Sequence, residues 1–367
     1  MGQTWTRRVV RASRELLAGV AVGLILWWLF AIPTSGTAPA PEEGEGLRLS
    51  PRGVSAGEAP LPEFVRQVFP AEKDDEEVPG DWDIMVYDAA RKEVVSMPLE
   101  EYLCGVVAAE MPAAYQGEAL KAQAVAARTY TAASMRRNGG AGCGKADTAD
   151  VCTSPAHCQA YSGKGALREK WGEDYRFYWE RITSAVAATH GEVVTYQGMP
   201  IHALYHAVSG GRTEDAKAVF NMRLPYLVSV ESAGEENAPR YRERTSFARA
   251  ELAALLNEAY PKAKLSAGKL QGQIEIKSRL QSGQVEKVRI GGTTISGVAF
   301  RKAAGIPSAN FSMAYDEKQV VITTQGYGHG VGMSQAGANA MAGRGCAYRE
   351  ILGHYYAGTE VTVFSYR

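Results

Sequence analysis

The sequence predicts an α+β fold, in which a mixed helical and antiparallel-sheet body carries a smaller inserted lobe, with a substrate groove between the two. Three features indicate this class. Residues 99–111 and 118–135 carry apolar residues at helical spacing, residues 193–206 form two short strand-like runs, and residues 247–308 have a helix followed by strands of their own. Helices and strands are therefore expected to be partly segregated along the chain.

The first 82 residues predict a membrane anchor followed by a tether. Residues 1–15 are basic and are expected to stay in the cytoplasm, while the apolar run 16–32 is just long enough to span a bilayer as one helix. A cleaved signal peptide is the alternative. Residues 33–82 are rich in Pro, Gly, Ala and Glu, which predicts a disordered extracytoplasmic tether. Under either interpretation the remaining chain lies outside the cytoplasm.

The folded part is expected to begin near residue 83 and to consist of a body with one insertion. Residues 83–246 and 309–367 would form the two parts of the body, and residues 247–308 a lobe that shapes one wall of a cleft. The 367 residues hold 40 Lys and Arg against 40 Asp and Glu. With no net charge there is no global field to attract nucleic acid.

The first candidate site lies where two predicted helices meet. The first helix ends before Pro112, because proline disfavours helical geometry for the residue that precedes it, so Glu110 falls at the helix C-terminus. The negative end of the helix dipole raises the pKa of an acid there and favours its protonated form. Lys121 and Arg128 are seven residues apart in the second helix and return to nearly the same face, where they can bind substrate near Glu110. The alternative is that all three are solvated surface residues.

A second candidate site is a cysteine cluster in a turn-rich segment. Cys143, Cys152, His157 and Cys158 supply thiolate and imidazole groups at short spacing, as in tetrahedral zinc sites. A disulfide between Cys152 and Cys158 and free thiols are the alternatives, since the segment is predicted to be extracytoplasmic. Two or three cysteine ligands favour a closed, structural site, so no metal is expected to be required for catalysis.

Two glycine-rich loops complete the set of candidates. The strand that carries His206 runs into Ser209-Gly-Gly, a sequence that lets the backbone approach a ligand. The last block, Gly-Tyr-Gly-His-Gly-Val-Gly-Met-Ser-Gln, has glycine at every second position and contains Tyr327, His329 and Gln335. Its spacing fits neither the dinucleotide fingerprint nor the P-loop. These five side chains are the expected substrate-binding residues of the two loops; a plain turn with a core histidine is the alternative for the first.

Five motifs in one order resemble the stage II sporulation protein D family, the membrane-anchored lytic transglycosylases of endospore-forming bacteria. They are Val-Val-Ala-Ala-Glu-Met-Pro, Leu-Lys-Ala-Gln-Ala-Val-Ala-Ala-Arg-Thr-Tyr, Ala-Asp-Val-Cys-Thr, Ser-Gly-Gly-Arg-Thr and Gly-Tyr-Gly-His-Gly-Val-Gly-Met-Ser-Gln. The resemblance covers nearly the whole predicted ectodomain. A related branch, the amidase enhancers, shares the domain.

The resemblance implies a peptidoglycan lytic transglycosylase that cleaves between N-acetylmuramic acid and N-acetylglucosamine and leaves a 1,6-anhydro sugar. In that case residues 83–246 and 309–367 form the catalytic core, Glu110 is the single catalytic acid, and the family's basic pair falls on Lys121 and Arg128. The implied partners are peptide-stripped glycan strands, the sporulation amidase (stage II sporulation protein P) and its membrane recruiter. The implied location is the cell membrane, with the catalytic domain between mother cell and forespore during engulfment. A non-catalytic, glycan-binding activator of an amidase is the alternative.

One position departs from the family pattern. Family members that bind zinc carry a histidine six residues before the first cysteine of the Ala-Asp-Val-Cys-Thr motif, and this chain has Ala146 there. Cys143 is the residue that can take its place, with a different reach. A structural zinc is therefore an open expectation at this cluster.

Overall fold

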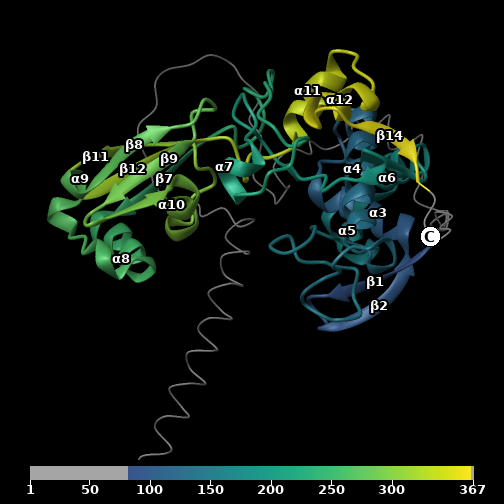
Figure 1. Ribbon diagram of the computed structural model, residues 1–367, viewed down its shortest axis with the longest axis horizontal. Helices are drawn as coiled ribbons and strands as arrows, with labels where there is room; N and C mark the ends of the chain where they lie inside the picture. Colours follow the sequence, from purple (N-terminus) through teal and green to yellow (C-terminus); the bar gives the residue numbers. More distant parts are fainter. Residues whose placement is uncertain (1–81, 365–367) are drawn as a thin grey trace, which may run out of the picture. The chain divides into compact units, whose positions relative to one another are not determined.

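The computed structural model describes residues 82–364, and within them it confirms the α+β class (Figure 1). The predicted membrane span, the basic N-terminus and the tether lie outside the described residues, apart from Trp82. Among residues 82–364 no helix is both long and apolar enough to cross a bilayer.

Six long helices and several short strands build the body. The helices are α3 (Leu99–Glu110), α4 (Gly117–Ser134), α5 (Lys164–Trp171), α6 (Tyr175–Ala187), α11 (Gln335–Gly343) and α12 (Tyr348–Tyr355), with the short α7 (Ala216–Phe220) beside them. The strands are β1 (Asp83–Asp88), β2 (Glu93–Pro98), β3 (Val151–Cys152), β4 (Glu192–Tyr196), β5 (Met199–Pro200), β6 (Tyr205–His206), β13 (Met333–Ser334) and β14 (Glu360–Val363).

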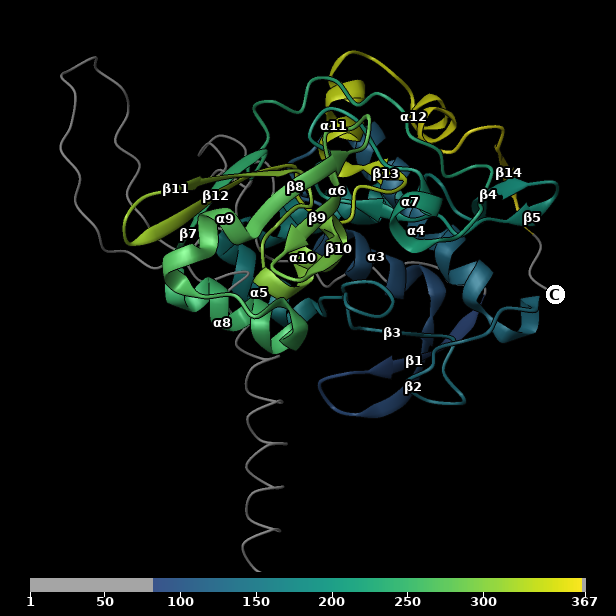
Figure 2. The same cartoon turned by 60° about the vertical axis from the view of Figure 1, so that its left-hand side comes forward.

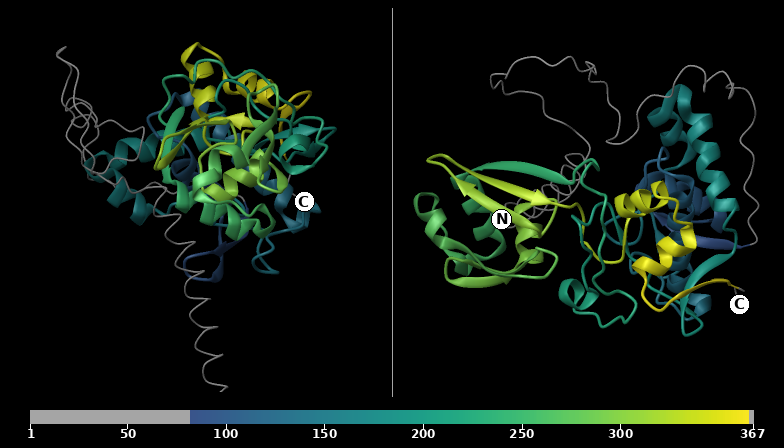
Figure 3. Two further views of the ribbon diagram at one scale, coloured as in Figure 1. Left: turned by 90° about the vertical axis from the view of Figure 1, so that its left-hand side faces the viewer. Right: turned by 90° about the horizontal axis from the view of Figure 1, so that it is seen from above.

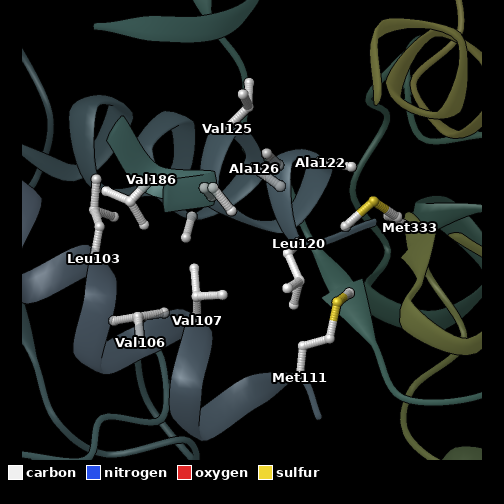
Figure 4. Packing of buried hydrophobic residues seen from close by; sticks show 14 of the residues in the cluster. Leu103, Val106, Val107, Met111, Leu120, Ala122, Val125, Ala126, Val186 and Met333 are labelled. Atoms are coloured by element: carbon white, nitrogen blue, oxygen red, sulfur yellow. The ribbon is translucent and has the colours of Figure 1, made fainter. Parts of the chain in front are cut away.

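Helix α4 forms the centre of the body. It is rich in alanine, so its backbone can lie close to neighbours on nearly every side, and it packs against α3, α6, α11, α12 and β4. Figure 4 shows Leu120, Ala122, Val125 and Ala126 of this helix among apolar side chains of α3 and α6 and Met333. In Figure 3 the C-terminal helices, in yellow, lie against the helices drawn in blue.

Small sheets flank these helices. One has the order β2-β1-β3, with β1 antiparallel to β2 and parallel to β3, and another has the order β14-β4-β5. The two-residue strands β13 and β6 pair in parallel, with Met333 opposite Tyr205 and Ser334 opposite His206. This last pair joins the two predicted glycine-rich loops, which are more than a hundred residues apart in the chain.

The lobe has a hydrophobic core of its own. It contains β7 (Arg242–Ala248), α8 (Arg249–Ala259), α9 (Leu270–Gln273), β8 (Ile274–Arg279), β9 (Val285–Ile290), β10 (Thr293–Ser296), α10 (Gly297–Ala304), β11 (Phe311–Tyr315) and β12 (Gln319–Gln325). Its sheets have the orders β10-β9-β8 and β11-β12-β7, both antiparallel (Figure 2). Because Phe311, Val320 and Ile322 belong to this core, we draw the lobe from residue 242 to 325, wider than the expected 247–308.

Two local predictions differ from the structure. Residues 201–204 are irregular rather than a strand, and only Tyr205 and His206 pair, because the carbonyl of Leu204 accepts a hydrogen bond from the Met333 amide instead of continuing the hairpin. Phe247 lies in β7 rather than in the helix that follows it. It is buried because alternate residues of this strand face the core.

Candidate active site

Glu110 is the last residue of α3, as the position of Pro112 predicts. Met111 is extended and buried, which turns the chain away from the helix and leaves the Glu110 side chain partly exposed. Its Oε1 accepts a hydrogen bond from the backbone amide of Ala160, at 2.6 Å. That loop can lie close to α3 because residue 105 is glycine: a Cβ there would be 2.3 Å from the ring of Tyr161.

The surroundings of Glu110 favour its protonated form near neutral pH. Burial raises the pKa of its carboxyl to about 7, and hydrogen bonds from the Ala160 amide and the Gln335 side chain oppose part of that rise. The direction agrees with the prediction made from the helix end, but burial, rather than the helix dipole, is the main cause. A carboxyl group with this pKa can donate a proton at neutral pH and take one back in the same reaction cycle.

Gln335 links the last glycine-rich motif to Glu110. It is the first residue of α11, where the Ser334 hydroxyl caps the helix by accepting from the Gly337 amide at 3.2 Å. The Gln335 side chain lies close enough to Glu110 to lower the pKa of its carboxyl, while its Nε2 donates to Oε1 of the buried Gln123 at 3.3 Å. Of the expected substrate-binding residues, Gln335 is therefore the one that reaches the proposed acid.

His206 and His329 form a separate pair of neutral imidazoles. Nδ1 of His206 donates to the carbonyl of Val331 at 3.1 Å, while Nδ1 of His329 accepts from the Val331 amide, also at 3.1 Å. Burial lowers the pKa of His206 to about 3 and that of His329 to about 4. His206 follows Tyr205 in β6 and so points to the opposite side of the strand, while the Tyr205 hydroxyl lies on the side of Glu110.

The His206 imidazole leaves one polar atom unused. Its ring centroid lies 5.6 Å from that of His329, and the exposed Phe220 of α7 meets His329 edge-on at 5.4 Å. Nε2 of His206 is buried and has no hydrogen-bond partner within residues 82–364. With Nδ1 protonated, Nε2 is an unused acceptor, and with their lowered pKa values neither imidazole can act as an acid at neutral pH.

The Ser209-Gly-Gly loop is held by a carboxylate that sequence analysis missed. Glu235 accepts hydrogen bonds from the Ser209 amide at 2.7 Å and from the Ser209 hydroxyl at 2.8 Å. Its side chain is almost fully buried and also contacts the hydroxyl of Ser232. The Ser209 hydroxyl is thus engaged within the fold, and it shapes the loop rather than presenting a free donor.

Tyr327 lies beside two arginines, neither of which was predicted as a site residue. The guanidinium of Arg240 sits 4.0 Å from the centre of the Tyr327 ring, a cation–π contact. Arg301, from helix α10 of the lobe, is close enough to lower the pKa values of both imidazoles and to influence that of Tyr327. Sequence carries no signal for Arg301, because only the tertiary fold brings α10 near these residues.

The structure corrects the prediction for Arg128 and separates Lys121 from it. Arg128 is fully buried, and its guanidinium binds both carboxylate oxygens of Glu100 at 2.6 and 2.8 Å and donates to the carbonyls of Val186 and Glu192. Arg128 therefore has neither a free hydrogen-bond donor nor exposed surface with which to bind a substrate. Lys121 is partly exposed and pairs with Glu118 at 2.7 Å, at the edge of a depression of about 450 Å³ next to Phe177 and Arg181.

The four residues of the cysteine cluster converge as predicted. Nδ1 of His157 lies 3.4, 3.6 and 3.3 Å from the sulfurs of Cys143, Cys152 and Cys158, and the four candidate ligand atoms all lie within 4.8 Å of one another. All five cysteines of the chain are free. A tetrahedral zinc with Zn–S near 2.3 Å would separate its ligands by about 3.8 Å. The spacing of these side chains fits that ion, and Cys143 is one of the four residues that meet.

Comparisons with known proteins identify the class to which this fold and site belong. A family model described as "Stage II sporulation protein" (SpoIID) matches residues 87–196, which include Glu110 and the cysteine cluster. Stage II sporulation protein D of Bacillus subtilis (strain 168) is 38% identical over 76% of this chain and 78% of that protein. The protein of the same name from Bacillus amyloliquefaciens is 35% identical over 95% of this chain and 94% of its own length.

The chain belongs to the stage II sporulation protein D family. The amidase enhancer of Bacillus subtilis (strain 168) is a more distant relative, 29% identical over 71% of this chain and 40% of that protein. These relationships agree with the family resemblance of the five motifs and connect the chain to sporulation and the cell wall.

Proposed function

We propose that this protein is a peptidoglycan lytic transglycosylase in which Glu110 is the single catalytic acid and base. The observation that carries the proposal is a partly exposed carboxyl group whose pKa is raised to about 7 by burial and which accepts a hydrogen bond from the Ala160 amide. Most glycosidases need two carboxyl groups. A transglycosylase needs one, since a hydroxyl of the substrate replaces water.

The proposed reaction balances around Glu110. The protonated carboxyl donates its proton to the glycosidic oxygen, and the bond from that oxygen to C1 of N-acetylmuramic acid breaks. The C6 hydroxyl of the same sugar forms the new bond to C1 and gives its proton to the Glu110 carboxylate, which regenerates the acid. Proton transfer by a positioned group contributes on the order of a hundredfold to ten-thousandfold in rate.

Product analysis tests this proposal. Incubation of the protein with peptide-stripped glycan strands should give products that end in 1,6-anhydro-muramic acid, detected by mass spectrometry. Glu110→Gln should remove the product while the fold is kept. Glu118→Gln is the matched control and should retain activity, because Glu118 lies beside Lys121 and Tyr348. No anhydro product, or the same amount with Glu110→Gln, would exclude the enzyme.

A non-catalytic role is the second candidate. The relative named "Amidase enhancer" supports a chain that grips glycan and stimulates an amidase without cutting. Stimulation of amidase turnover that survives Glu110→Gln, with no anhydro product from the unmodified protein, would favour that function. Under either function the proposed partners are peptide-stripped glycan and the sporulation amidase, stage II sporulation protein P, with its membrane recruiter.

The proposed location is the space between mother cell and forespore during engulfment, with residues 16–32 as a single-pass anchor. The basic residues before that run and its length support this placement. Fractionation of sporulating cells, followed by protease treatment of intact protoplasts, tests it: the domain should remain with the membrane and be degraded from the outside.

The cysteine cluster is proposed to hold a structural zinc. Cys143, Cys152 and Cys158 would supply thiolates and His157 an imidazole nitrogen, and bound zinc would tie the 143–158 segment together. With four protein ligands no position is left for a reacting molecule, so the metal has no part in the proposed reaction. The 143–158 segment leads directly to Ala160, whose amide holds Glu110.

A further inference from the structure

The lobe carries an uncovered sheet face whose chemistry the proposed reaction does not use. In the sheet β11-β12-β7, one face packs Phe247, Phe311 and Ile322 into the lobe core beside α8. Successive side chains of a strand point to opposite faces of the sheet, so the residues that alternate with these core residues lie on the other face. That outer face, which we call the β7 face, carries Arg242, Arg244, Ser246, Ser312, Thr323 and Gln325.

The β7 face is positively charged and has no acidic partner. Arg242 and Arg244 are exposed, lie two residues apart on one strand, and form no ion pair within residues 82–364. The single carboxylate of the three strands, Glu243, alternates to the opposite side and binds Arg240 at 3.1 Å. The acidic residues of the β11–β12 turn, Asp316 and Glu317, lie at the other end of the strands. Residues 242–325 hold thirteen Lys and Arg against seven Asp and Glu in an otherwise neutral chain.

The β7 face continues into the Ser209-Gly-Gly loop of the body. Gln325 is the cross-strand partner of Arg242, and its Nε2 donates to the carbonyl of Gly210 at 2.8 Å and to the Tyr241 hydroxyl at 3.1 Å. Gly326, the first residue of the last glycine-rich motif, follows directly and donates to the carbonyl of Tyr241. A ligand that lies along the β7 face therefore meets the two glycine-rich loops.

We propose that the β7 face binds the lactyl carboxylates of peptide-stripped glycan. The inference rests on the proposed function, which supplies the substrate class. Removal of the peptide from a muramic acid turns the lactyl amide into a free carboxylate, so a stripped strand carries a regular series of negative charges close to the sugar rings. Planar guanidinium groups bind carboxylates with two parallel hydrogen bonds, and the hydroxyl groups of Ser246 and Thr323 suit sugar hydroxyls.

This arrangement gives the chain a means to distinguish stripped strands from strands that still carry peptides. A peptide on the lactyl group neutralises the charge next to the sugar and adds bulk there. The site would therefore favour the product of an amidase reaction, the class of reaction that must come first to supply such a substrate.

A binding experiment in the Glu110→Gln background tests the proposal without cleavage. Affinity of the full-length chain is measured for stripped strands and for the same strands after carbodiimide conversion of every lactyl carboxylate to an amide. The stripped strands should bind about tenfold more tightly at low salt, and the difference should vanish at 1 M salt, where the Debye length is about 3 Å. Equal affinity for the two kinds of strand at low salt would overturn the proposal.

Charge-matched variants identify the surface. Arg242→Gln with Arg244→Gln should remove most of the preference for the carboxylate form, and Arg242→Lys with Arg244→Lys should restore part of it. The control, Lys262→Gln with Lys264→Gln, removes the same charge just after α8, on the covered side of the sheet, and should leave the preference unchanged. An equal loss of the preference in both double variants would refute specific binding at the β7 face. Failure of the proposed reaction appears separately, as absence of anhydro product from the unmodified chain.

Discussion

Replacement of Glu110 by glutamine should stabilise the protein at high pH. In the folded chain the pKa of the carboxyl is about 7, against 4.5 for an unperturbed glutamate. Between these two values the native state binds more protons than the unfolded state, so the free energy of unfolding falls as the pH rises. Well above pH 7 the carboxylate is charged in both states, and the folded state is then destabilised by the full free energy of holding that charge in a largely desolvated place. Glutamine has nearly the same shape, can accept the Ala160 hydrogen bond, and carries no charge.

The magnitude follows from the pKa. Each pKa unit corresponds to about 1.4 kcal/mol, so a rise from 4.5 to about 7 gives about 3 kcal/mol, and partial exposure of the side chain lowers the expected gain to about 2 kcal/mol. Glu110→Gln should therefore be more stable than the unmodified chain by about 2 kcal/mol at pH 8.5. At pH 4.5 the folded state is protonated and the unfolded state half protonated, so the carboxyl contributes only about 0.4 kcal/mol and the two proteins should differ little.

Urea denaturation at the two pH values measures this difference. Glu118→Gln is the control of opposite sign: burial alone would raise the pKa of Glu118, but its hydrogen bonds with Lys121 and the Tyr348 amide lower it overall, so its loss should slightly destabilise the protein near neutral pH. If Glu110→Gln has the same effect at pH 4.5 and 8.5, or destabilises at the higher pH, the carboxyl is not held in the environment described here.

Four further predictions follow from named contacts. Arg128→Met should destabilise the protein by about 3–5 kcal/mol in denaturant titrations, because Glu100 is left buried and unpaired; a normal stability with a raised KM would instead return Arg128 to a substrate role. Cys152→Ser should lower the thermal midpoint and weaken the thiolate-to-cobalt charge-transfer band of protein loaded with Co²⁺ by about a third, because two of the three thiolates remain, and an unaltered band would rule out this ligand set. Gly332→Ala should cost about 3 kcal/mol or more, since residue 332 has φ +74° and a Cβ would lie 1.9 Å from the Leu204 carbonyl, whereas Gly343→Ala meets nothing within 4 Å and should change stability little. The value of kcat/KM should fall about tenfold per pH unit above pH 7, as protonated Glu110 is lost; a flat profile up to pH 9 would speak against an acid with this pKa.

Sequence predicted the site best where local chemistry determines geometry. Pro112 places Glu110 at the end of α3, and the Ser334 cap with Gln335 starts α11 at the position that the glycine-rich motif indicates. The convergence of the cysteine cluster was also predictable, because its four residues lie within a stretch of sixteen residues and need only a compact turn to meet.

The sequence did not predict the position of a side chain where that position depended on which side of a helix or strand faces the core. A seven-residue spacing puts Lys121 and Arg128 on one face of the helix. It does not show that α4 is the central helix, or that the buried Glu100 forms an ion pair with Arg128. The same limit hides Glu235, whose partner Ser209 lies 26 residues away, and Arg301, which the lobe brings near His206. The two imidazoles were predicted as substrate contacts, and only burial shows that they stay neutral.

The membrane anchor and the tether stay predictions from the sequence, since residues 1–81 lie outside the described part of the chain. A lobe was also predicted, from its pattern of one helix and several strands, and residues 242–325 have a hydrophobic core of their own. No local pattern indicates where the lobe begins and ends, because β12 pairs with β7 more than seventy residues away along the chain, and β11 pairs with β12.

Cleavage of peptide-stripped strands in water enriched with oxygen-18 tests the central claim most directly. If the C6 hydroxyl of muramic acid attacks C1 with Glu110 as the one acid and base, the muramic acid end made by each cleavage should be an anhydro sugar free of the heavy isotope. Incorporation of one oxygen-18 atom at the new reducing end would mean that water is the nucleophile, and the single-carboxylate mechanism would be contradicted.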